Sequence, residues 1–336
     1  MSEHKPSMRD IARAVGTSAV TVSKALAGKS GMSDALREKI LKTAEAMGYV
    51  YGGEGIPGKP HLDIGILVPE RYFAPDSFYN EMYRVLVRQL TEKGHFGLLE
   101  LLSTETEEAL TQPNLVSSGR ADGMIILGEP TKAYYRMLTK SGVPMVFLDF
   151  YDERGTADAV VGDNTYGTYR LTNHLIHEGH TKIGFVGNRL ATASIMDRYL
   201  GYYRAMLTNE LEIREHWILQ DRGVTGGLVM PELPEDMPTA FVCNCDLTAR
   251  MMMEALRAAG YRVPEDVSVT GFDDYPPGNE SETGLSTFRI DTEGMVSLAV
   301  KAVIERCAGS DRHPGRTVVG GEPVYRESDV PLRTGE

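Results

Sequence analysis

The N-terminal fold is decided by the stretch MRDIARAVGTSAVTVSKALAG, which occupies residues 8–28. Its apolar residues recur at helical spacing up to Val15, and Gly16 is placed to end that helix. A second helical segment begins at Ser18 and ends before Gly28. Two short helices joined by a turn that contains glycine are typical of a helix-turn-helix unit, although a small helical bundle without DNA function gives the same pattern.

A third helix is expected between a Ser33 cap and Gly48. Its predicted inward-facing side chains are Leu36, Ile40, Leu41, Ala44 and Met47. The first fifty residues therefore predict a small all-α head.

The charge is unevenly distributed between this head and the remainder. The chain of 336 residues has a formal net charge of -12, which argues against a polyanionic partner. Residues 1–60, however, contain nine basic and six acidic residues, whereas the remainder contains 26 basic and 41 acidic residues. A basic head on an acidic body points to nucleic acid at the head, and an ordinary solvated surface remains the alternative.

Composition excludes several classes of protein. The chain is 42% hydrophobic and 24% charged, which is typical of a globular protein rather than a disordered or fibrous one. No apolar stretch approaches the roughly 18 residues of a membrane-spanning helix, and residues 1–10 have no apolar segment typical of a secretory signal, so we expect a cytoplasmic protein. The three cysteines predict no disulfide framework. We expect Cys243 and Cys245 to be small apolar residues on a buried strand rather than metal ligands, and we expect no metal or cofactor.

From residue 61 onward, buried strands alternate with amphipathic helices. Strands are predicted over residues 63–69, 97–101, 123–127, 145–149, 182–186, 240–244 and 267–272. Helices are predicted over residues 78–93, 131–140, 165–177, 197–207, 247–259 and 292–307. Such alternation is typical of parallel sheets covered by helices. The predicted fold class is therefore α/β, with the all-α head followed by two doubly wound parallel-sheet lobes.

One set of head residues forms a pattern in register over some forty positions: Met8–Ala12, Val15–Ser18, Thr21–Leu26, Gly28–Lys29, Ser33, Leu36–Ile40 and Gly48–Tyr49. In this pattern the chain resembles the LacI/GalR family of bacterial transcriptional repressors. A match of this length is far more specific than a short motif. The resemblance implies a regulator that binds double-stranded, pseudopalindromic operator DNA as a homodimer.

The resemblance also implies roles for individual head residues. Ala19 and Val20 fall at the main base-reading positions, where they would contact thymine methyl groups or permit close approach, and Lys24 would read guanine. The hydroxyl side chains are candidate contacts to the DNA backbone: Ser7, Ser18, Thr21 and Ser23. Helix capping is an equal alternative for Ser7 and Ser18.

The segment after the head departs from the family pattern. The resemblance predicts a short hinge helix with a leucine that wedges into the minor groove. Residues 52–60 instead read GGEGIPGKP, and their glycines and prolines predict a flexible linker and little DNA bending. Residues 53–58 also fit G-x-G-x-x-G, but no strand precedes them and no helix follows, so a nucleotide site is not expected.

The body carries further family marks: Val161–Asn164, Gly179–Ile183, Gly201–Tyr202, Val267–Asp274 and Arg326–Ser328. Members of the family look like periplasmic sugar-binding proteins fused to a DNA-binding head. The resemblance implies four parts: a head at 1–51, a linker at 52–60, a first lobe at 61–160 with 291–317, and a second lobe at 161–290 with 318–336. A sugar or related small molecule would bind between the lobes.

The candidate effector-binding residues are Phe78, Tyr79, Asp149, Ser194, Arg198 and Asp273. Arg198 matches the family's effector-contacting arginine, and a guanidinium fork suits sugar hydroxyls or a carboxylate. For Arg198 and Asp273 the alternative is a salt bridge between the lobes, and for Phe78 and Tyr79 it is packing in a helix core. Cys245 stands where the family commonly has asparagine, which indicates a ligand that differs from the usual sugars.

Enzyme signals are weak. His174, His177 and His180 do not form a zinc-protease motif, and no nucleophile elbow or phosphate-binding loop is present. The sequence therefore favours a ligand-responsive repressor of carbohydrate utilisation genes that is not an enzyme. The alternative is a sugar-binding protein or an enzyme on the same fold without operator binding.

Overall fold

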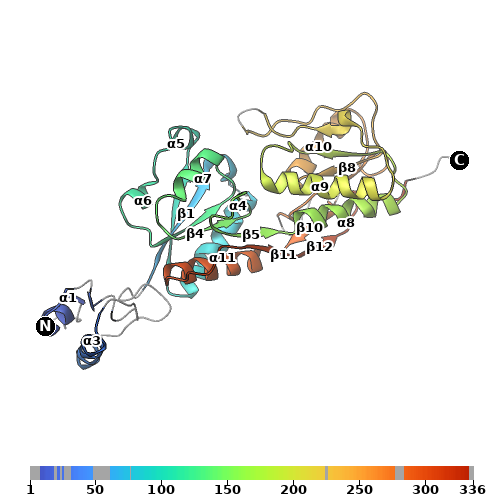
Figure 1. Ribbon diagram of the computed structural model, residues 1–336. Coiled ribbons are helices and arrows are strands. Elements are labelled where there is room, and N and C mark those ends of the chain that lie inside the picture. The colour runs from blue at the N-terminus through green and yellow to red at the C-terminus, as the bar shows by residue number, and fades with distance from the viewer. Residues whose placement is uncertain are drawn as a thin grey trace.

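The computed structural model describes residues 8–18, 21–22, 25, 32–47, 61–75, 77–223, 226–276 and 284–332. The predicted linker at 52–60 lies outside these residues, as do five of the candidate DNA contacts: Ser7, Ala19, Val20, Ser23 and Lys24. Figure 1 shows two α/β lobes joined by strands that pass from one to the other.

The head contains α1 (Met8–Val15) and α3 (Asp34–Ala46), and Thr21 and Val22 between them are also helical. Gly16 ends α1 at a φ of 79°, where its amide donates to the carbonyl of Ala12. A side chain is rarely tolerated at such a φ, which explains the glycine. The predicted end of the first helix is confirmed.

The head core is formed by buried apolar side chains from all three segments: Ile11, Ala12, Val15, Val22, Ala25, Ile40 and Ala44. Leu36 packs against this core, as predicted. Leu41 and Met47 do not, because they are 45% and 38% exposed. Leu41 lies about 100° around the helix from Ile40, and Met47 follows the end of α3, so neither shares the inward stripe.

The first lobe is built on a six-stranded parallel sheet in the order β11-β5-β4-β3-β1-β2. Its strands are β1 (Asp63–Pro69), β2 (Phe96–Leu102), β3 (Gly123–Leu127), β4 (Met145–Leu148), β5 (Asp158–Gly162) and β11 (Arg316–Val319). Its helices are α4 (Phe78–Glu92), α5 (Thr104–Glu108), α6 (Asn114–Ser117), α7 (Lys132–Leu138) and α11 (Thr292–Cys307), with the short 3-10 helix η1 (Glu70–Tyr72). Ile66 and Leu67 enter different apolar cores, so both faces of the sheet are covered.

One predicted buried strand is an edge strand. β2 pairs only with β1 among the described strands, and most of its side chains are partly exposed, including Phe96 at 54%. The apolar run of β2 resembles that of a buried central strand, so the sequence pattern did not reveal that β2 lies at the edge of the sheet.

The second lobe has a four-stranded parallel sheet in the order β7-β6-β8-β9. Its strands are β6 (Ile183–Val186), β7 (Ile218–Leu219), β8 (Ala240–Cys243) and β9 (Ser268–Thr270). Its helices are α8 (Asn164–His177), α9 (Ala193–Thr208) and α10 (Asp246–Ala258), with the short 3-10 helix η2 (Glu215–Trp217). The structure therefore has two lobes, each a parallel sheet packed with helices, which agrees with the predicted fold class.

The chain passes between the lobes along three paths. It leaves the first sheet after β5, returns through β10 (Thr287–Ile290) into α11, and leaves again from β11 into β12 (Gly321–Val324). β10 and β12 pair with each other in antiparallel register (Figure 1). The expected lobe limits at 160/161 and 317/318 fall inside β5 and β11, both members of the first sheet, and the division into four parts stays a prediction.

Within the described residues, no helix is both long and apolar enough to span a bilayer.

Candidate functional site

A cavity of about 240 Å³ lies between the lobes, where strands of both sheets end. The loops that line it follow β1, β4, β7, β8 and β9. Ligands commonly bind at the carboxyl ends of parallel strands. All six predicted effector-binding residues line this cavity: Phe78, Tyr79, Asp149, Ser194, Arg198 and Asp273.

Arg198 lies on α9 and is buried at the centre of a polar cluster. Its Nε donates to Asn164 Oδ1 at 2.7 Å, its Nη1 to the carbonyl of Asn244 at 2.6 Å, and its Nη2 lies 2.9 Å from Asp273 Oδ1. The guanidinium also covers the ring of Phe272. Arg198 and Asp273 therefore form a salt bridge within the second lobe, not the salt bridge between the lobes that we considered as an alternative.

Asp149 follows β4 and faces Arg198 from the first lobe. Tyr79 Oη donates to Asp149 Oδ2 at 2.7 Å, whereas Oδ1 is buried without a hydrogen-bond partner among the described residues. Burial raises the pKa of Asp149, and the nearby Arg198 opposes that shift. Gly128 permits this packing, because a Cβ there would lie 3.1 Å from the rings of Tyr72 and Tyr79. Asp149 Oδ1 is thus available to accept from a ligand hydroxyl.

The two predicted aromatic residues differ in their surroundings. Tyr79 stacks on Tyr72, with 5.4 Å between ring centroids, and is bound to Asp149. Phe78 meets Tyr275 edge to face across the cleft, with 6.2 Å between centroids. Ser194 is buried in the first turn of α9, where its hydroxyl lies 3.0 Å from that of Thr192.

Cys245 is not on a strand, which corrects our expectation for the cysteine pair. Cys243 ends β8 and is buried, but Cys245 is the N-cap of α10, and its sulfur accepts from the Thr248 amide at 3.5 Å. Burial raises the pKa of the Cys245 thiol, so the neutral thiol faces the cavity. Asn244 also lines the cavity, and its side-chain amide donates to Asp221 Oδ2 at 2.7 Å.

Several residues that line the cavity were not predicted from the sequence: Arg71, Arg222, Asp246, Arg250 and Tyr275. Arg71 follows β1, and Arg222 follows β7. The rule that ligands bind where parallel strands end would have indicated Arg71, because β1 was predicted. It gave no indication of Arg222, because β7 has only two residues and no recognisable pattern.

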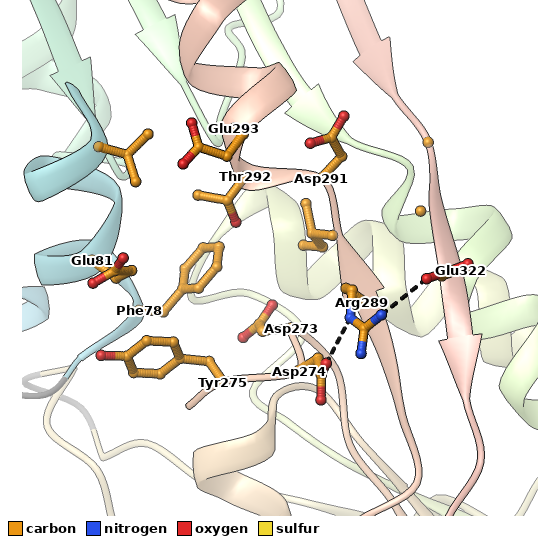
Figure 2. Close-up of a pocket in the computed structure, with 14 residues that line it drawn as sticks. Phe78, Glu81, Asp273, Asp274, Tyr275, Arg289, Asp291, Thr292, Glu293 and Glu322 are labelled. Atoms are coloured by element: carbon orange, nitrogen blue, oxygen red, sulfur yellow. Dashed lines mark hydrogen bonds and ion pairs between the residues drawn. The ribbon is translucent and has the colours of Figure 1, made fainter. Parts of the chain in front are cut away.

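A second, wider cavity of about 630 Å³ shares Phe78, Asp273 and Tyr275 with the first (Figure 2). There Asp274 turns away from Asp273 and binds Arg289 at 2.8 Å, and Arg289 also contacts Glu322 at 3.0 Å. The two neighbouring aspartates therefore point in different directions.

In the head, Ser18 and Thr21 are the two candidate DNA contacts that the structure describes. Ser18 Oγ accepts from the Thr21 amide at 3.1 Å and lies 2.8 Å from Thr21 Oγ1. Ser18 thus caps the following segment, and its exposed position leaves a DNA contact open.

Two family models match separate parts of the chain. The model described as bacterial regulatory proteins, lacI family, matches residues 7–51, and the periplasmic binding protein-like domain matches residues 172–328. The chain belongs to the LacI family of bacterial regulatory proteins.

Curated relatives match this LacI-family chain over nearly its whole length. The ribose operon repressor of Haemophilus influenzae is 25% identical over 334 residues, which cover 97% of this chain and 99% of the relative. The HTH-type transcriptional repressor PurR of Aliivibrio salmonicida is 25% identical over 337 residues, with coverage of 96% and 98%.

Solved structures share the LacI-family fold. The transcriptional regulator CelR in complex with cellobiose has a TM-score of 0.68 at 22% identity and covers 96% of this chain and 99% of its own. The lac repressor dimer bound to operator and the anti-inducer ONPF has a TM-score of 0.64 at 20% identity, with coverage of 97% and 99%.

Proposed function

We propose that this LacI-family protein is an operator-binding repressor whose affinity for DNA is controlled by a small molecule bound between its lobes. The observation that carries the proposal is the joining, in one chain, of a helix-turn-helix head to two lobes that enclose a cavity with charged side chains in its lining. The curated relatives named as repressors match nearly the whole chain, which supports the same division into a DNA-binding head and a ligand-binding body.

The head supports DNA binding through its second helical segment. Val22 and Ala25 are buried in the head core with Ile11 and Ile40, whereas Ser18 is exposed and Thr21 is only partly buried. We assign base contacts to Ala19, Val20 and Lys24. Backbone contacts are assigned to the hydroxyl residues Ser7, Ser18, Thr21 and Ser23.

The cavity supports a sugar or a sugar derivative as the ligand. Asp149 and Asp273 supply carboxylate acceptors for hydroxyl groups, and Phe78 and Tyr275 supply ring faces. One relative is named for the ribose operon, and one structural neighbour was solved with cellobiose. We therefore assign carbohydrate utilisation genes as the regulated targets.

Coupling to the head would proceed through the relative position of the lobes. Contacts cross the cleft beside the cavity: the amide of Ala193 donates to Glu129 Oε2 at 2.6 Å, and Tyr151 Oη donates to Asp197 Oδ1 at 3.0 Å. A ligand that favours one degree of closure shifts the population of that state. In a homodimer this shift moves the two heads, and the two-fold symmetry implies a pseudopalindromic operator.

The test is selection of bound sequences from random DNA by the full-length protein, followed by affinity measurement on the selected site. We expect a pseudopalindrome and a loss of about 5- to 150-fold in affinity for Lys24→Ala. Lys42→Ala is the matched control, because Lys42 is an exposed lysine on α3 paired with Glu38. No enriched pseudopalindrome, or equal losses in both variants, would overturn the proposal.

A further inference from the structure

Each lobe contributes to the cavity an arginine that is held from behind by a fully buried carboxylate. Arg71 comes from η1 in the first lobe and is paired with Glu107, whereas Arg222 follows β7 in the second lobe and is paired with Asp221. Both carboxylate side chains have no exposed surface. An arginine fixed in this way presents a pre-oriented cation.

The Arg71 side chain is fixed at three points. Its Nη1 donates to Glu107 Oε1 at 2.5 Å, its Nη2 donates to the carbonyl of Glu129 at 3.1 Å, and its guanidinium lies 4.8 Å from the ring centroid of Tyr72. Glu107 also accepts from the amide of Thr131 at 2.6 Å. Glu107 therefore holds Arg71 at the cavity and does not itself line it.

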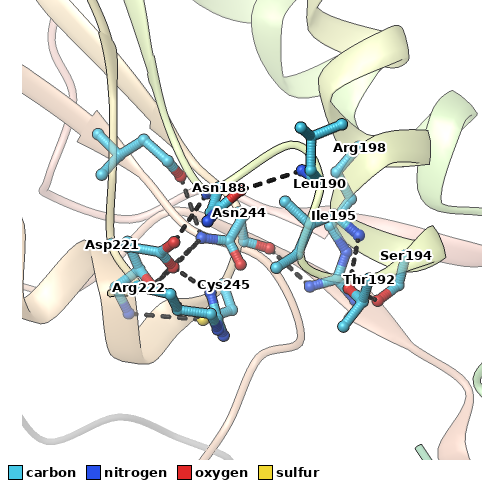
Figure 3. A network of polar contacts seen from close by, with 12 residues as sticks. Asn188, Leu190, Thr192, Ser194, Ile195, Arg198, Asp221, Arg222, Asn244 and Cys245 are labelled. Carbon is cyan, nitrogen blue, oxygen red and sulfur yellow. Dashed lines mark hydrogen bonds and ion pairs between the residues drawn. The ribbon is translucent and has the colours of Figure 1, made fainter. Parts of the chain in front are cut away.

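Asp221 holds Arg222 by a single hydrogen bond (Figure 3). Asp221 accepts from the Asn188 amide at 2.8 Å, Asn244 Nδ2 at 2.7 Å and Thr248 Oγ1 at 2.8 Å, and it also binds Arg222 Nη1. With four donors around it, Asp221 is a buried anchor. Among the described residues, the Arg222 guanidinium makes only this one hydrogen bond, so most of its five N–H donors are not used within them.

The two arginines line the same region of the cavity. Arg71 Cδ lies 3.5 Å from the position that a Cβ on Gly226 would take, and Gly226 and Arg222 belong to one loop that lines the cavity. Arg250 adds a third cation, and its Nη1 is buried without a hydrogen-bond partner among the described residues. The N-terminus of α10, capped by Cys245, also reaches this region, and a helix N-terminus favours negative charge.

We propose that the ligand is a polyol of about one sugar ring that carries an anionic group, either a carboxylate or a phosphate. The anionic group lies between Arg71 and Arg222, and the hydroxyl groups lie at Asp149 and Asp273. An anion there would bind one cation from each lobe and so favour closure of the cleft. The inference rests on the proposed function only in taking this cavity as the ligand site.

The test is calorimetry on the full-length protein with matched probes: D-glucose, D-glucuronate and D-glucose 6-phosphate, the same three forms of galactose, and inorganic phosphate. We expect at least one anionic sugar to bind ten times or more tightly than its neutral parent. The carboxylate and phosphate arms show which anion is preferred. Equal binding of neutral and anionic sugars, or no binding of any anionic probe at about 10 mM, would overturn the inference.

The double variant D221N/R222Q removes both charges, so that no buried carboxylate is left unpaired. We expect it to bind the preferred anionic sugar about tenfold to a hundredfold more weakly and to lose the preference for that sugar over its neutral parent. Arg189→Gln is the control, because Arg189 pairs with the exposed Glu215 outside the cavity. Unchanged affinity for the anionic sugar would overturn the inference. Circular dichroism checks folding, and Arg250→Gln replaces the double variant if that variant does not fold.

Operator binding by the same wild-type preparation separates this inference from the proposed function. If the protein binds DNA but prefers neutral sugars, only the inference of an anionic ligand is contradicted. If the protein binds anionic sugars but selects no DNA sequence, only the proposed function as a repressor is contradicted.

Discussion

Arg198 on α9 and Asp273, which follows β9, form a buried ion pair with 2.9 Å between Nη2 and Oδ1. The other edges of the guanidinium are taken by Asn164 and by the carbonyl of Asn244. Arg198 therefore holds α9, α8 and the loop after β8 together at the cavity. These contacts use three of the five N–H donors of the guanidinium, which leaves two for a ligand in the cavity.

Arg198→Ala is expected to lower the free energy of unfolding by about 3–5 kcal/mol, because it leaves Asp273 buried without its cation. Urea denaturation monitored by fluorescence measures this change. Arg189→Ala should cost less than about 1 kcal/mol, since its partner Glu215 is exposed. Similar losses in the two variants would show that the Arg198 pair has no special role in stability.

Tyr79→Phe removes the donor to Asp149 Oδ2 and leaves a buried acceptor unsatisfied. We expect a loss of about 1–3 kcal/mol in unfolding free energy, measured by thermal or urea denaturation. Tyr83→Phe is the matched control, because Tyr83 contacts Phe73 through its ring. If both variants lose the same stability, the hydrogen bond to Asp149 is not the cause.

Gly201→Ala is expected to disturb the close packing of α8 and α9. A Cβ at Gly201 would overlap the carbonyl oxygen of Thr165 and lie 2.9 Å from the Tyr169 amide nitrogen, and backbone atoms cannot rotate away. The expected cost is about 1–3 kcal/mol in unfolding free energy. Gly320→Ala has no atom within 4 Å of the new Cβ and should be nearly neutral. A melting temperature equal to that of wild type for Gly201→Ala would refute the packing account.

The sequence predicted the strands and helices of the lobes well because their periods are clear. β1, β3 and α11 have the predicted limits, and α4 ends one residue early. The short strands β7, β10, β11 and β12 were missed, because two to four residues carry too little periodicity, and the five-residue strand β5 was missed as well.

The cavity was predicted in part. Residues that follow recognisable strands, such as Asp149 and Asp273, were found from position and resemblance. Arg222 and Asp246 were missed, because their placement depends on which loops tertiary packing brings together. Cys245 was expected on a strand because the sequence does not show where β8 ends and α10 begins. Boundaries between elements are uncertain by a residue or two.

Asp246 should make stability depend on pH. Burial raises the pKa of Asp246 to about 7 from an ordinary value of 3.8, although Thr287 and the Tyr275 amide bind its carboxylate. Between these values the folded chain holds a proton that the unfolded chain has lost. Stability should therefore fall as pH rises through this window, by up to about 1.4 kcal/mol per pH unit.

Urea denaturation between pH 5 and pH 7 measures this dependence. Asp246→Asn should show a flatter slope. Asp266→Asn should retain the wild-type slope, because Arg262 lowers the pKa of Asp266 to about 2, below the window. A wild-type slope in Asp246→Asn would mean that Asp246 does not titrate there.

The central claim is that a ligand in the cavity controls the affinity of the head for DNA. Fluorescence anisotropy of the full-length protein on its selected operator, with and without a saturating sugar that binds the cavity, tests it most directly. We predict that the operator Kd changes by about fivefold or more. An operator Kd that is the same with and without saturating ligand would contradict the account.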